Sequence, residues 1–501
     1  MIHLIFDPMN AHTISFIIII LLLSICRANS QTQELVLDLD RTTSIACDSS
    51  LQAYSAKNAY LSSYWEYRSY RAARLPSLTL TMTPMQYSRS FISRYDSESN
   101  TDVYRRQQSI YSSGNLSIKQ NFDLTGGTFF IDSELGYVRN FGENTTNQYS
   151  SVPLRIGYSQ NLFGFNSFKW EKNIEPLKYE KAKKKYLYTV EQVSETAIQY
   201  FFSLAMAQAE YDLAKNNISS SDSLYHMGME RQKIASISQA DLLTLKLDVI
   251  NARNSLKNAE ISLKKAMFSF VSYLNLDENT KIRLILPDKP ARIELSPEKA
   301  LEQVRKNNPD LLENKQNIFE AEQAVEKAKK SANFDASLYA SVGFNQVAST
   351  IGGSYENPLQ QDIITVGVQV PLIDWGVRKG KVNMAKNDLN VTRISVKQNE
   401  LSLQEEILMS VNDFNVQQDL ILSAEEAMDI ANQAFDATKQ RFLIGKADVS
   451  SLTLALNRQE SAHKNYISAL QNYWVSYYKI RKLTLFDFEK NEPLSSNYEK
   501  L

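Results

Sequence analysis

The sequence has little of what marks several common protein classes. Its 501 residues include only 2 cysteines, 15 glycines and 12 prolines. So few glycines and prolines favour long, uninterrupted helices. Neither sign of charge is in excess, since 55 Lys and Arg stand against 56 Asp and Glu, a net charge of −1. A balance of this kind gives no indication of a nucleic-acid partner, and none is expected.

No apolar run is long enough for a membrane-spanning helix. The longest, Ile14–Ile25, is about a dozen residues where roughly 20 are needed. We interpret it as the core of a signal peptide over residues 1–30, with lipidation of Cys26 as the alternative to plain cleavage. Cys47 is then the only cysteine left, so no disulfide can form within the chain. If the mature chain enters a membrane, β-strands must carry it.

The sequence repeats itself after 210 residues. The equivalent pairs are Gly157 and Gly367, Leu162 and Leu372, Arg231 and Arg441, Leu242 and Leu452, Ala252 and Ala462, and Ala259 and Ala469. A repeat of this length without a gap predicts one supersecondary unit used twice.

Each repeat begins with a helical pattern, at roughly 44–73 and 297–332, and then changes to alternating apolar and polar residues. Leu78, Leu80 and Met82 alternate with threonines and a serine, and the same alternation recurs around residues 154–158, 338–344 and 364–370. Alternation suits a wall between lipid and a wet interior. Taken alone, it suits a soluble sandwich equally well.

Each pair of strands leads into a very long helix. The predicted helices run from Ser167 to about Met227 and from Gly376 to about Leu443, and Pro176 is the only proline inside them. Apolar residues at steps of three and four continue along the helices that follow, which predicts one antiparallel coiled-coil hairpin in each repeat. Sixty residues of helix reach some 90 Å, so we expect an elongated molecule.

Four strands cannot close a barrel, for which about eight are needed. Three copies would supply twelve strands and twelve long helices around one axis. The first repeat also contains an extra hairpin, at 116–122 and 129–137, that turns at Thr125-Gly126-Gly127. If it joins the wall, three copies would give about eighteen strands, and the sequence leaves twelve and eighteen both open.

With these features the sequence resembles the TolC family of outer-membrane efflux and secretion channels, over nearly all of the mature chain. Its local signatures are the strand-to-helix junctions at 160–166 and 371–376 and the segment Arg441-Phe442-Leu443-Ile444-Gly445. The resemblance implies an α+β membrane protein in which each repeat gives two barrel strands and a long hairpin. Three copies would form a β-barrel continued by a periplasmic α-barrel.

The resemblance also assigns roles to residues. By position, the hairpin tips that meet a periplasmic adaptor protein are Arg231, Ala235, Arg441 and Gly445. The channel entrance is expected at Asp241, Ser451 and Leu454, and the strand-to-helix junction at Pro371, Trp375 and Gly376. Ser451 and Leu454 stand where the family's best-known entrance has acids, which weakens the expectation of an acidic, cation-binding gate.

Simpler interpretations of some of these residues stay open. Arg231 and Arg441 also suit plain solvated positions near helix ends. Trp170 and Trp375 suit either an aromatic belt at the membrane surface or packing between helices. His226 and His463 have no metal-ligand spacing around them, so we expect no metal, no cofactor and no enzymatic activity.

The predicted function is a passive exit duct in the outer membrane of a Gram-negative bacterium, extending into the periplasm. The expected partners are two further copies, a periplasmic adaptor, outer-membrane lipid and, indirectly, an inner-membrane pump. A periplasmic coiled-coil adaptor or scaffold is the alternative. The predicted segments are signal peptide 1–30, first helix region 31–74, strands 75–165, hairpin 166–275, linker and short helices 276–332, strands 333–374, hairpin 375–486 and tail 487–501.

Overall fold

The computed structural model describes residues 35–141, 145–234, 237–496 and 498. The predicted signal peptide with Cys26, and Ala235 at the first turn, lie outside these residues. The chain divides into two compact units. We call residues up to 56, 189–300 and 409–494 the helical unit, and residues 57–188, 301–408 and from 495 onward the sheet unit.

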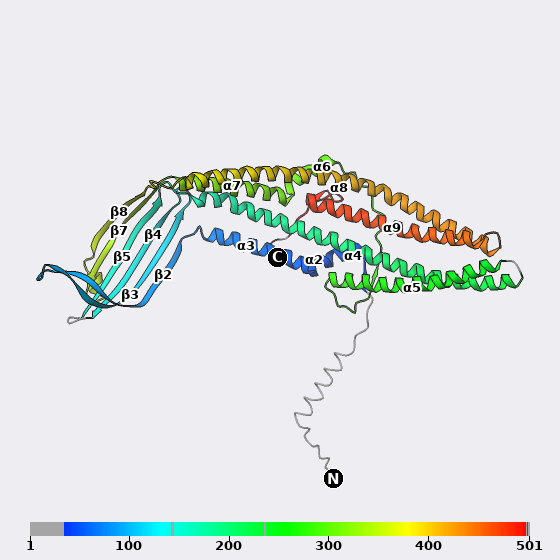
Figure 1. Cartoon of the computed structure of the whole chain (residues 1–501), viewed down its shortest axis with the longest axis horizontal. Helices are drawn as coiled ribbons and strands as arrows, with labels where there is room; N and C mark the ends of the chain where they lie inside the picture. Colours follow the sequence, from blue (N-terminus) through cyan, green and yellow to red (C-terminus); the bar gives the residue numbers. More distant parts are fainter. Residues whose placement is uncertain (1–34, 142–144, 235–236, 497, 499–501) are drawn as a thin grey trace, which may run out of the picture. The chain divides into compact units, whose positions relative to one another are not determined.

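The sheet unit contains one six-stranded antiparallel sheet in the order β2-β3-β4-β5-β7-β8 (Figure 1). Its strands are β2 Ser77–Asp96, β3 Thr101–Phe122, β4 Gly127–Phe141, β5 Thr146–Asn161, β7 Asp335–Ala348 and β8 Leu359–Gln369. β3 and β4 are the extra hairpin of the first repeat, and they pair from Phe122↔Gly127 onward. This hairpin therefore belongs to the sheet, to which the first repeat supplies four strands and the second supplies two.

The two faces of this sheet differ in polarity. Leu78, Ile118, Ile131, Ile156 and Val342 are cross-strand neighbours on one face, and all five are exposed. The adjacent row on the other face carries Thr79, Ser117, Asp132 and Arg155, and the last two form an ion pair at 2.7 Å. A continuous apolar face opposite a polar one is the pattern of strands that separate lipid from an aqueous interior.

Eight helices are observed in the described residues. They are α2 Leu39–Ser49, α3 Leu51–Ala72, α4 Ser167–Lys233, α5 Gln239–Tyr273, α6 Pro297–Asn307, α7 Pro309–Ala332, α8 Val377–Leu443 and α9 Val449–Thr484. α4 and α8 each contain 67 residues, and both their starts and their ends lie 210 positions apart. The predicted repeat is therefore confirmed in the fold. Among these residues no helix has an apolar segment that could cross a bilayer.

The helical unit is held together by the apolar seams of the hairpins and by ion pairs between α4 and α9. Val193, Ala197 and Leu204 on α4 are buried, as the heptad pattern predicts. Arg481 on α9 reaches Glu191 on α4 at 3.1 Å, and Lys482 reaches Glu195 at 2.6 Å. A short parallel pair, β1 Leu35–Leu37 with β6 Ile282–Leu284, also lies in this unit.

Candidate functional site at the two hairpin turns

The turn of the second hairpin ends α8 with a glycine cap. Gly445 has a φ of +77°, its N–H donates to the carbonyl of Phe442 at 3.0 Å, and the N–H of Lys446 donates to the carbonyl of Arg441 at 2.8 Å. Two such bonds with a left-handed residue form the Schellman motif, which favours glycine because other residues lose roughly 1–2 kcal/mol in this conformation. Gly445 is therefore required by the shape of the turn itself.

α5 and α9, the second helices of the two hairpins, are both capped by a serine and an aspartate, but the two residue types occupy opposite positions. At the start of α5, Ser238 and Asp241 form a capping box, in which the Ser238 Oγ accepts from the Asp241 N–H at 3.0 Å and the Asp241 carboxylate accepts from the Ser238 N–H at 3.2 Å. At the start of α9, Asp448 accepts from the Ser451 N–H at 2.7 Å. Hydrogen bonds from Ser451 hold the pKa of Asp448 below its ordinary value. Both helices thus carry one acid and one serine at equivalent positions, in reverse order.

A small apolar cluster joins the ends of the two hairpins. Leu245 of α5, Phe442 of α8 and Val449 and Leu452 of α9 are almost fully buried together. Partly buried residues complete the cluster, namely Leu224, Tyr225, Met227, Ile237, Phe435 and Ala447. The two hairpins of one chain therefore end in one shared cluster.

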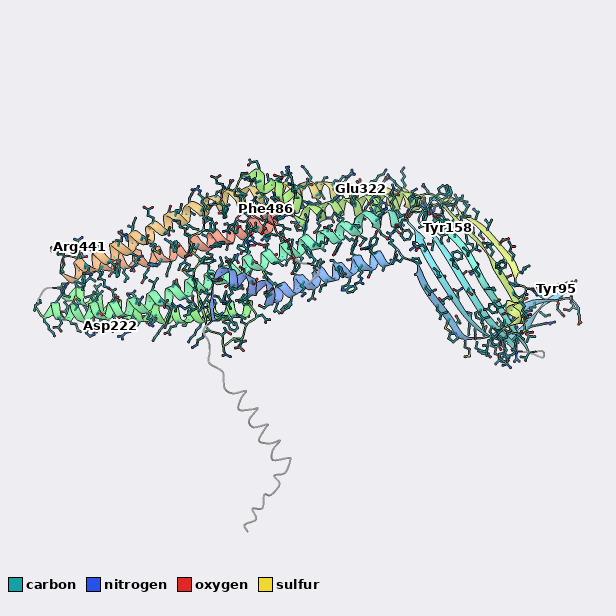
Figure 2. All side chains as sticks on the ribbon, turned by 180° about the vertical axis from the view of Figure 1, so that it is seen from behind. Tyr95, Tyr158, Asp222, Glu322, Arg441 and Phe486 are labelled. Atoms are coloured by element: carbon teal, nitrogen blue, oxygen red, sulfur yellow. The ribbon has the colours of Figure 1, made fainter. Side chains whose placement is uncertain are left out.

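Arg231 and Arg441 occupy equivalent positions in the repeat but different environments. The Arg231 guanidinium, from α4, donates to the carbonyls of Phe442 at 3.0 Å and Leu443 at 2.8 Å, and it stacks on the Phe442 ring at 5.2 Å. It thereby fastens the first hairpin to the carboxyl end of α8, where a cation is favourable. Arg441 is exposed, and among the described residues its guanidinium makes only a 3.5 Å contact with the Lys446 carbonyl (Figure 2).

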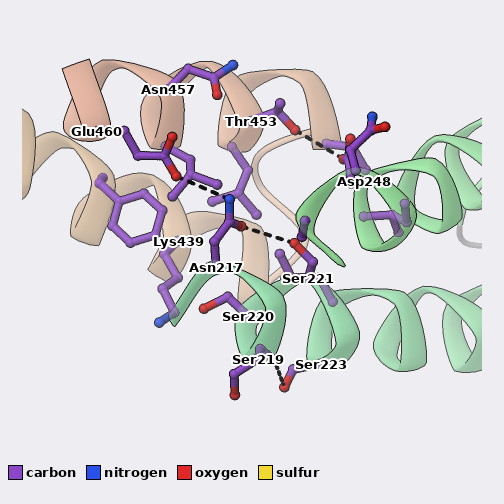
Figure 3. Close-up of a pocket in the computed structure, with 18 of the residues that line it drawn as sticks. Asn217, Ser219, Ser220, Ser221, Ser223, Asp248, Lys439, Thr453, Asn457 and Glu460 are labelled. Atoms are coloured by element: carbon purple, nitrogen blue, oxygen red, sulfur yellow. Dashed lines mark hydrogen bonds between the residues drawn. The ribbon is translucent and has the colours of Figure 1, made fainter. Parts of the chain in front are cut away.

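A cavity of about 600 Å³ with a mixed polar and apolar lining lies next to this cluster, between α4, α5, α8 and α9 (Figure 3). Few bonds cross it. The Asn217 side chain donates to Glu460 at 3.2 Å, and Thr453 donates weakly to Asp248 at 3.5 Å. Burial raises the pKa of Asp248, although the bond from Thr453 opposes this shift. The hairpins are therefore packed tightly at their ends and loosely beside the cavity.

The predicted entrance residues Asp241 and Ser451 each form hydrogen bonds in the cap of their own helix. The Asp241 carboxylate is engaged in the capping box, and the Ser451 backbone is engaged with Asp448. Leu454 is 51% exposed on α9. Their roles at an entrance remain predictions, because three copies would be needed to bring equivalent residues together.

The predicted strand-to-helix junction is an exposed turn. Trp375 has a φ of +54° and is 93% exposed, and it is followed by Gly376 with a φ of +89°. Pro371 lies just after β8 and is partly exposed. The two tryptophans of the repeats differ, because the Trp170 Nε1 donates to Glu326 on α7 at 2.7 Å. Trp170 thus packs between helices, whereas Trp375 is free to meet another surface.

Sequence reasoning missed the cavity and the partners of Arg231. One signal was present, since Ser219, Ser220, Ser221 and Ser223 crowd a single turn region of α4 and all line the cavity. The equivalent stretch of α8, 429–433, contains no serine. Across the described residues, no group of three or more His, Cys, Asp or Glu side chains is placed to hold a metal ion.

The sequence of the second repeat also matches a known family. Residues 300–484, which reach from α6 to the end of α9, match the model of the outer membrane efflux protein family. The match covers little more than a third of the chain, so the second repeat is similar to this family.

Several solved outer-membrane channels share the fold of this chain. The Campylobacter jejuni CmeC outer membrane channel matches with a TM-score of 0.65 and 14% identity, over 92% of this chain and 88% of that one. The outer membrane protein VceC of Vibrio cholerae matches with a TM-score of 0.62 and 13% identity, over 91% of this chain and 97% of that one. The open state of the Neisseria gonorrhoeae MtrE channel matches with a TM-score of 0.58 and 15% identity, over 89% of this chain and 88% of that one. The predicted TolC-like fold class is confirmed.

A curated relative matches over only part of its length. An uncharacterized protein of Haemophilus influenzae is 22% identical over 225 residues, which is 44% of this chain and 48% of the relative. The chain thus spans about half the length of the curated relative that it matches.

Proposed function

We propose that this efflux protein is one protomer of a homotrimeric, passive exit duct in the outer membrane. A periplasmic adaptor couples the duct to an inner-membrane pump of a tripartite efflux or type I secretion system. The observation that carries the proposal is the open six-stranded sheet, with one apolar and one polar face and two unpaired edges, β2 and β8. Three such sheets supply eighteen strands, enough for a barrel with an aqueous interior.

The long helices support the same symmetry. Within the chain, α4 and α9 are joined by polar pairs, with Lys464 at 2.9 Å from Glu210 and Asn217 at 3.2 Å from Glu460. If neighbouring copies repeat this packing, α8 of one copy meets α5 of the next. The residues equivalent to Glu210 and Glu460 are then Leu420 and Ile250, which are 47% and 48% exposed in the single chain.

Both residues belong to apolar strips. The α5 strip consists of Leu243, Leu247, Ile250, Ile261 and Phe268, and the α8 strip consists of Val416, Leu420, Ala427 and Ile430. Neighbours within each strip are spaced as on one face of a helix, and exposed apolar strips of this length mark contacts with another chain. The interface between copies is therefore apolar where the interface within a copy is charged.

The hairpin turns form the periplasmic entrance in this proposal. Asp241, Ser451 and Leu454 face the entrance, and Arg231, Ala235, Arg441 and Gly445 lie at the tips, where the adaptor docks. Because Arg231 is bound to α8, the exposed Arg441 and the Gly445 turn are the tip residues available to the adaptor. Arg231 instead helps keep the two hairpins of one copy together, and with them the entrance closed.

Arg231→Gln is expected to open the entrance. The change removes two charged hydrogen bonds to the end of α8, together worth roughly 1.5–3 kcal/mol, so the open fraction should rise by about tenfold or more. Single-channel conductance of the purified protein in a planar bilayer measures this effect. Cells carrying the variant should also become sensitive to large antibiotics.

Arg441→Gln is the matched control, because it removes the same charge at the equivalent position of the repeat. The hydrogen bonds of Arg231 to the end of α8 stay intact in this variant. Its conductance should equal that of the parent protein. Equal conductance for all three proteins would contradict the locking role of Arg231.

Gly445→Val is expected to impair export while the trimer still forms and inserts. Valine loses roughly 1–2 kcal/mol in the left-handed conformation, so the turn should change shape where the adaptor docks. Crosslinking to the adaptor and export of a pump substrate measure the effect. Gly445→Asn should retain most of both activities, since asparagine tolerates this conformation. Undiminished crosslinking with Gly445→Val would count against docking at this turn.

The coupling itself is tested by crosslinking in intact cells. A periplasmic adaptor should be captured with the efflux protein, and its inner-membrane partner would identify the pump class. Capture of the pump without any adaptor would contradict the tripartite arrangement.

A further inference from the structure

β2 and β3 extend beyond the rest of the sheet as a two-stranded ribbon of residues 90–107, with the Arg89↔Gln108 pair at its base. β4 pairs with β3 only up to Gln108↔Phe141, whereas β2 and β3 stay paired as far as Asp96↔Thr101. The ribbon lies at the end of the sheet away from the start of β2, with Tyr95 near its tip (Figures 1 and 2). No other strand in the described part of the chain pairs with it. A two-stranded ribbon is marginally stable alone, so a partner would stabilise it.

One face of the ribbon combines arginines with exposed aromatic rings. Phe91 lies directly opposite Arg106, Tyr104 follows two residues before Arg106 on β3, and Arg89 lies two residues before Phe91 on β2. Phe91 is 71% exposed and Tyr104 is 77% exposed. We call Arg89, Phe91, Tyr104 and Arg106 the arginine–aromatic face.

The arginines on the two faces differ in their partners. On the opposite face, Arg105 forms an ion pair with Asp96 at 2.9 Å and Arg94 donates to Gln107 at 3.0 Å. On the arginine–aromatic face, neither Arg89 nor Arg106 has an ion pair or a side-chain hydrogen bond to any residue that the structure describes. Two guanidinium groups with all their donors available therefore flank an exposed aromatic ring.

This combination fits a phosphorylated saccharide. A guanidinium presents paired N–H donors whose spacing matches phosphate oxygens, and the charge assistance makes these bonds strong. The flat apolar faces of Phe91 and Tyr104 suit packing against the C–H faces of sugar rings. An uncharged protein surface would leave both guanidinium groups unpaired, so charge complementarity favours an anionic ligand.

We propose that the arginine–aromatic face binds the phosphorylated saccharide of lipopolysaccharide in the outer leaflet of the outer membrane. The inference rests on the proposed function, which puts the helices in the periplasm and hence the ribbon on the outer side. Binding would order the ribbon and anchor the rim of the duct in the saccharide layer.

The test uses the full-length protein purified in detergent, titrated with lipopolysaccharide. The variant is Arg89→Gln/Arg106→Gln, and the matched control is Arg94→Gln/Arg105→Gln, which removes two positive charges from the other face of the same ribbon. Loss of two charged contacts should weaken binding of the variant at least ~10-fold. The control should bind within about twofold of the parent protein. Enzymatically dephosphorylated lipopolysaccharide should bind the parent protein as weakly as the variant binds intact lipopolysaccharide.

Three results would overturn the proposal. Equal weakening in the variant and the control would show attraction by general charge, and unchanged binding in both would show no site. Loss of the trimer only in Arg89→Gln/Arg106→Gln would show that the face contacts another copy. Since binding is measured on purified protein, these outcomes are separate from the proposed function. Absence of the parent protein from the outer-membrane fraction would contradict the proposed function instead.

Discussion

Leu420→Glu is expected to convert the assembled efflux protein into monomers. In the proposed trimer, Leu420 of α8 lies opposite Asn254 of the next copy, the counterpart of Lys464, and a glutamate there would be buried without a counter-charge directly opposite at all three interfaces. An uncompensated buried charge costs roughly 3–5 kcal/mol, so each interface should lose more than about a hundredfold in association constant. Ile250→Glu should act in the same way from α5. The mass of the detergent-solubilised protein measures the effect.

Ser262→Glu is the control for these two changes. Ser262 is exposed on α5 but lies outside the apolar strip, so the substitution adds the same charge without burying it. This variant should remain assembled. A trimer that persists in both Leu420→Glu and Ile250→Glu would exclude the α5 and α8 strips as the interface.

Arg481→Met is expected to produce the largest loss of stability within a single chain. The Arg481 guanidinium binds Glu191 at 3.1 Å and Asp487 at 3.0 Å, and the Asp487 side chain is only 4% exposed. Burial raises the pKa of Glu191, against the lowering effect of Arg481. Removing the cation leaves two buried carboxylates without a counter-charge, a cost of roughly 3–5 kcal/mol. The thermal unfolding temperature of this variant in detergent should be well below that of the parent protein.

Lys464→Met tests whether ion pairs of α4 and α9 in general have this effect. The Lys464–Glu210 pair has the same helices and polarity, but its side chains are 45% and 32% exposed. Such a pair contributes about 0–1 kcal/mol to the free energy of unfolding, so the unfolding temperature of Lys464→Met should hardly differ from that of the parent protein. Similar losses in both variants would contradict a special role for the buried network around Arg481.

The sequence was sufficient for those features that rest on periodicity and repetition. Alternation predicted the strands, and heptads predicted the hairpins. The predicted starts of the long helices, Ser167 and Gly376, agree with the observed Ser167 and Val377, whereas α4 continues to Lys233 beyond the predicted Met227. The extra hairpin of the first repeat was visible as a pattern, but its pairing was not. Alternation fixes which side chains share a face and leaves open which strand lies beside which.

The site was less predictable because equivalent residues of the two repeats have different neighbours in the folded chain. Arg231 and Arg441 are identical residues at equivalent positions, yet among the described residues only Arg231 donates to the carboxyl end of the other hairpin's long helix. Asp241 matched the position of an entrance acid, and the same carboxylate also completes a capping box. Both interactions depend on which helix end lies nearby, and that information is absent from a one-dimensional pattern.

The mass of the mature protein in detergent tests the central claim most directly. A six-stranded sheet with two free edges, continued by helices with exposed apolar strips, needs further copies to be complete. The proposal predicts a single species that contains three copies of the chain. A monodisperse monomer that remains soluble and folded would contradict it.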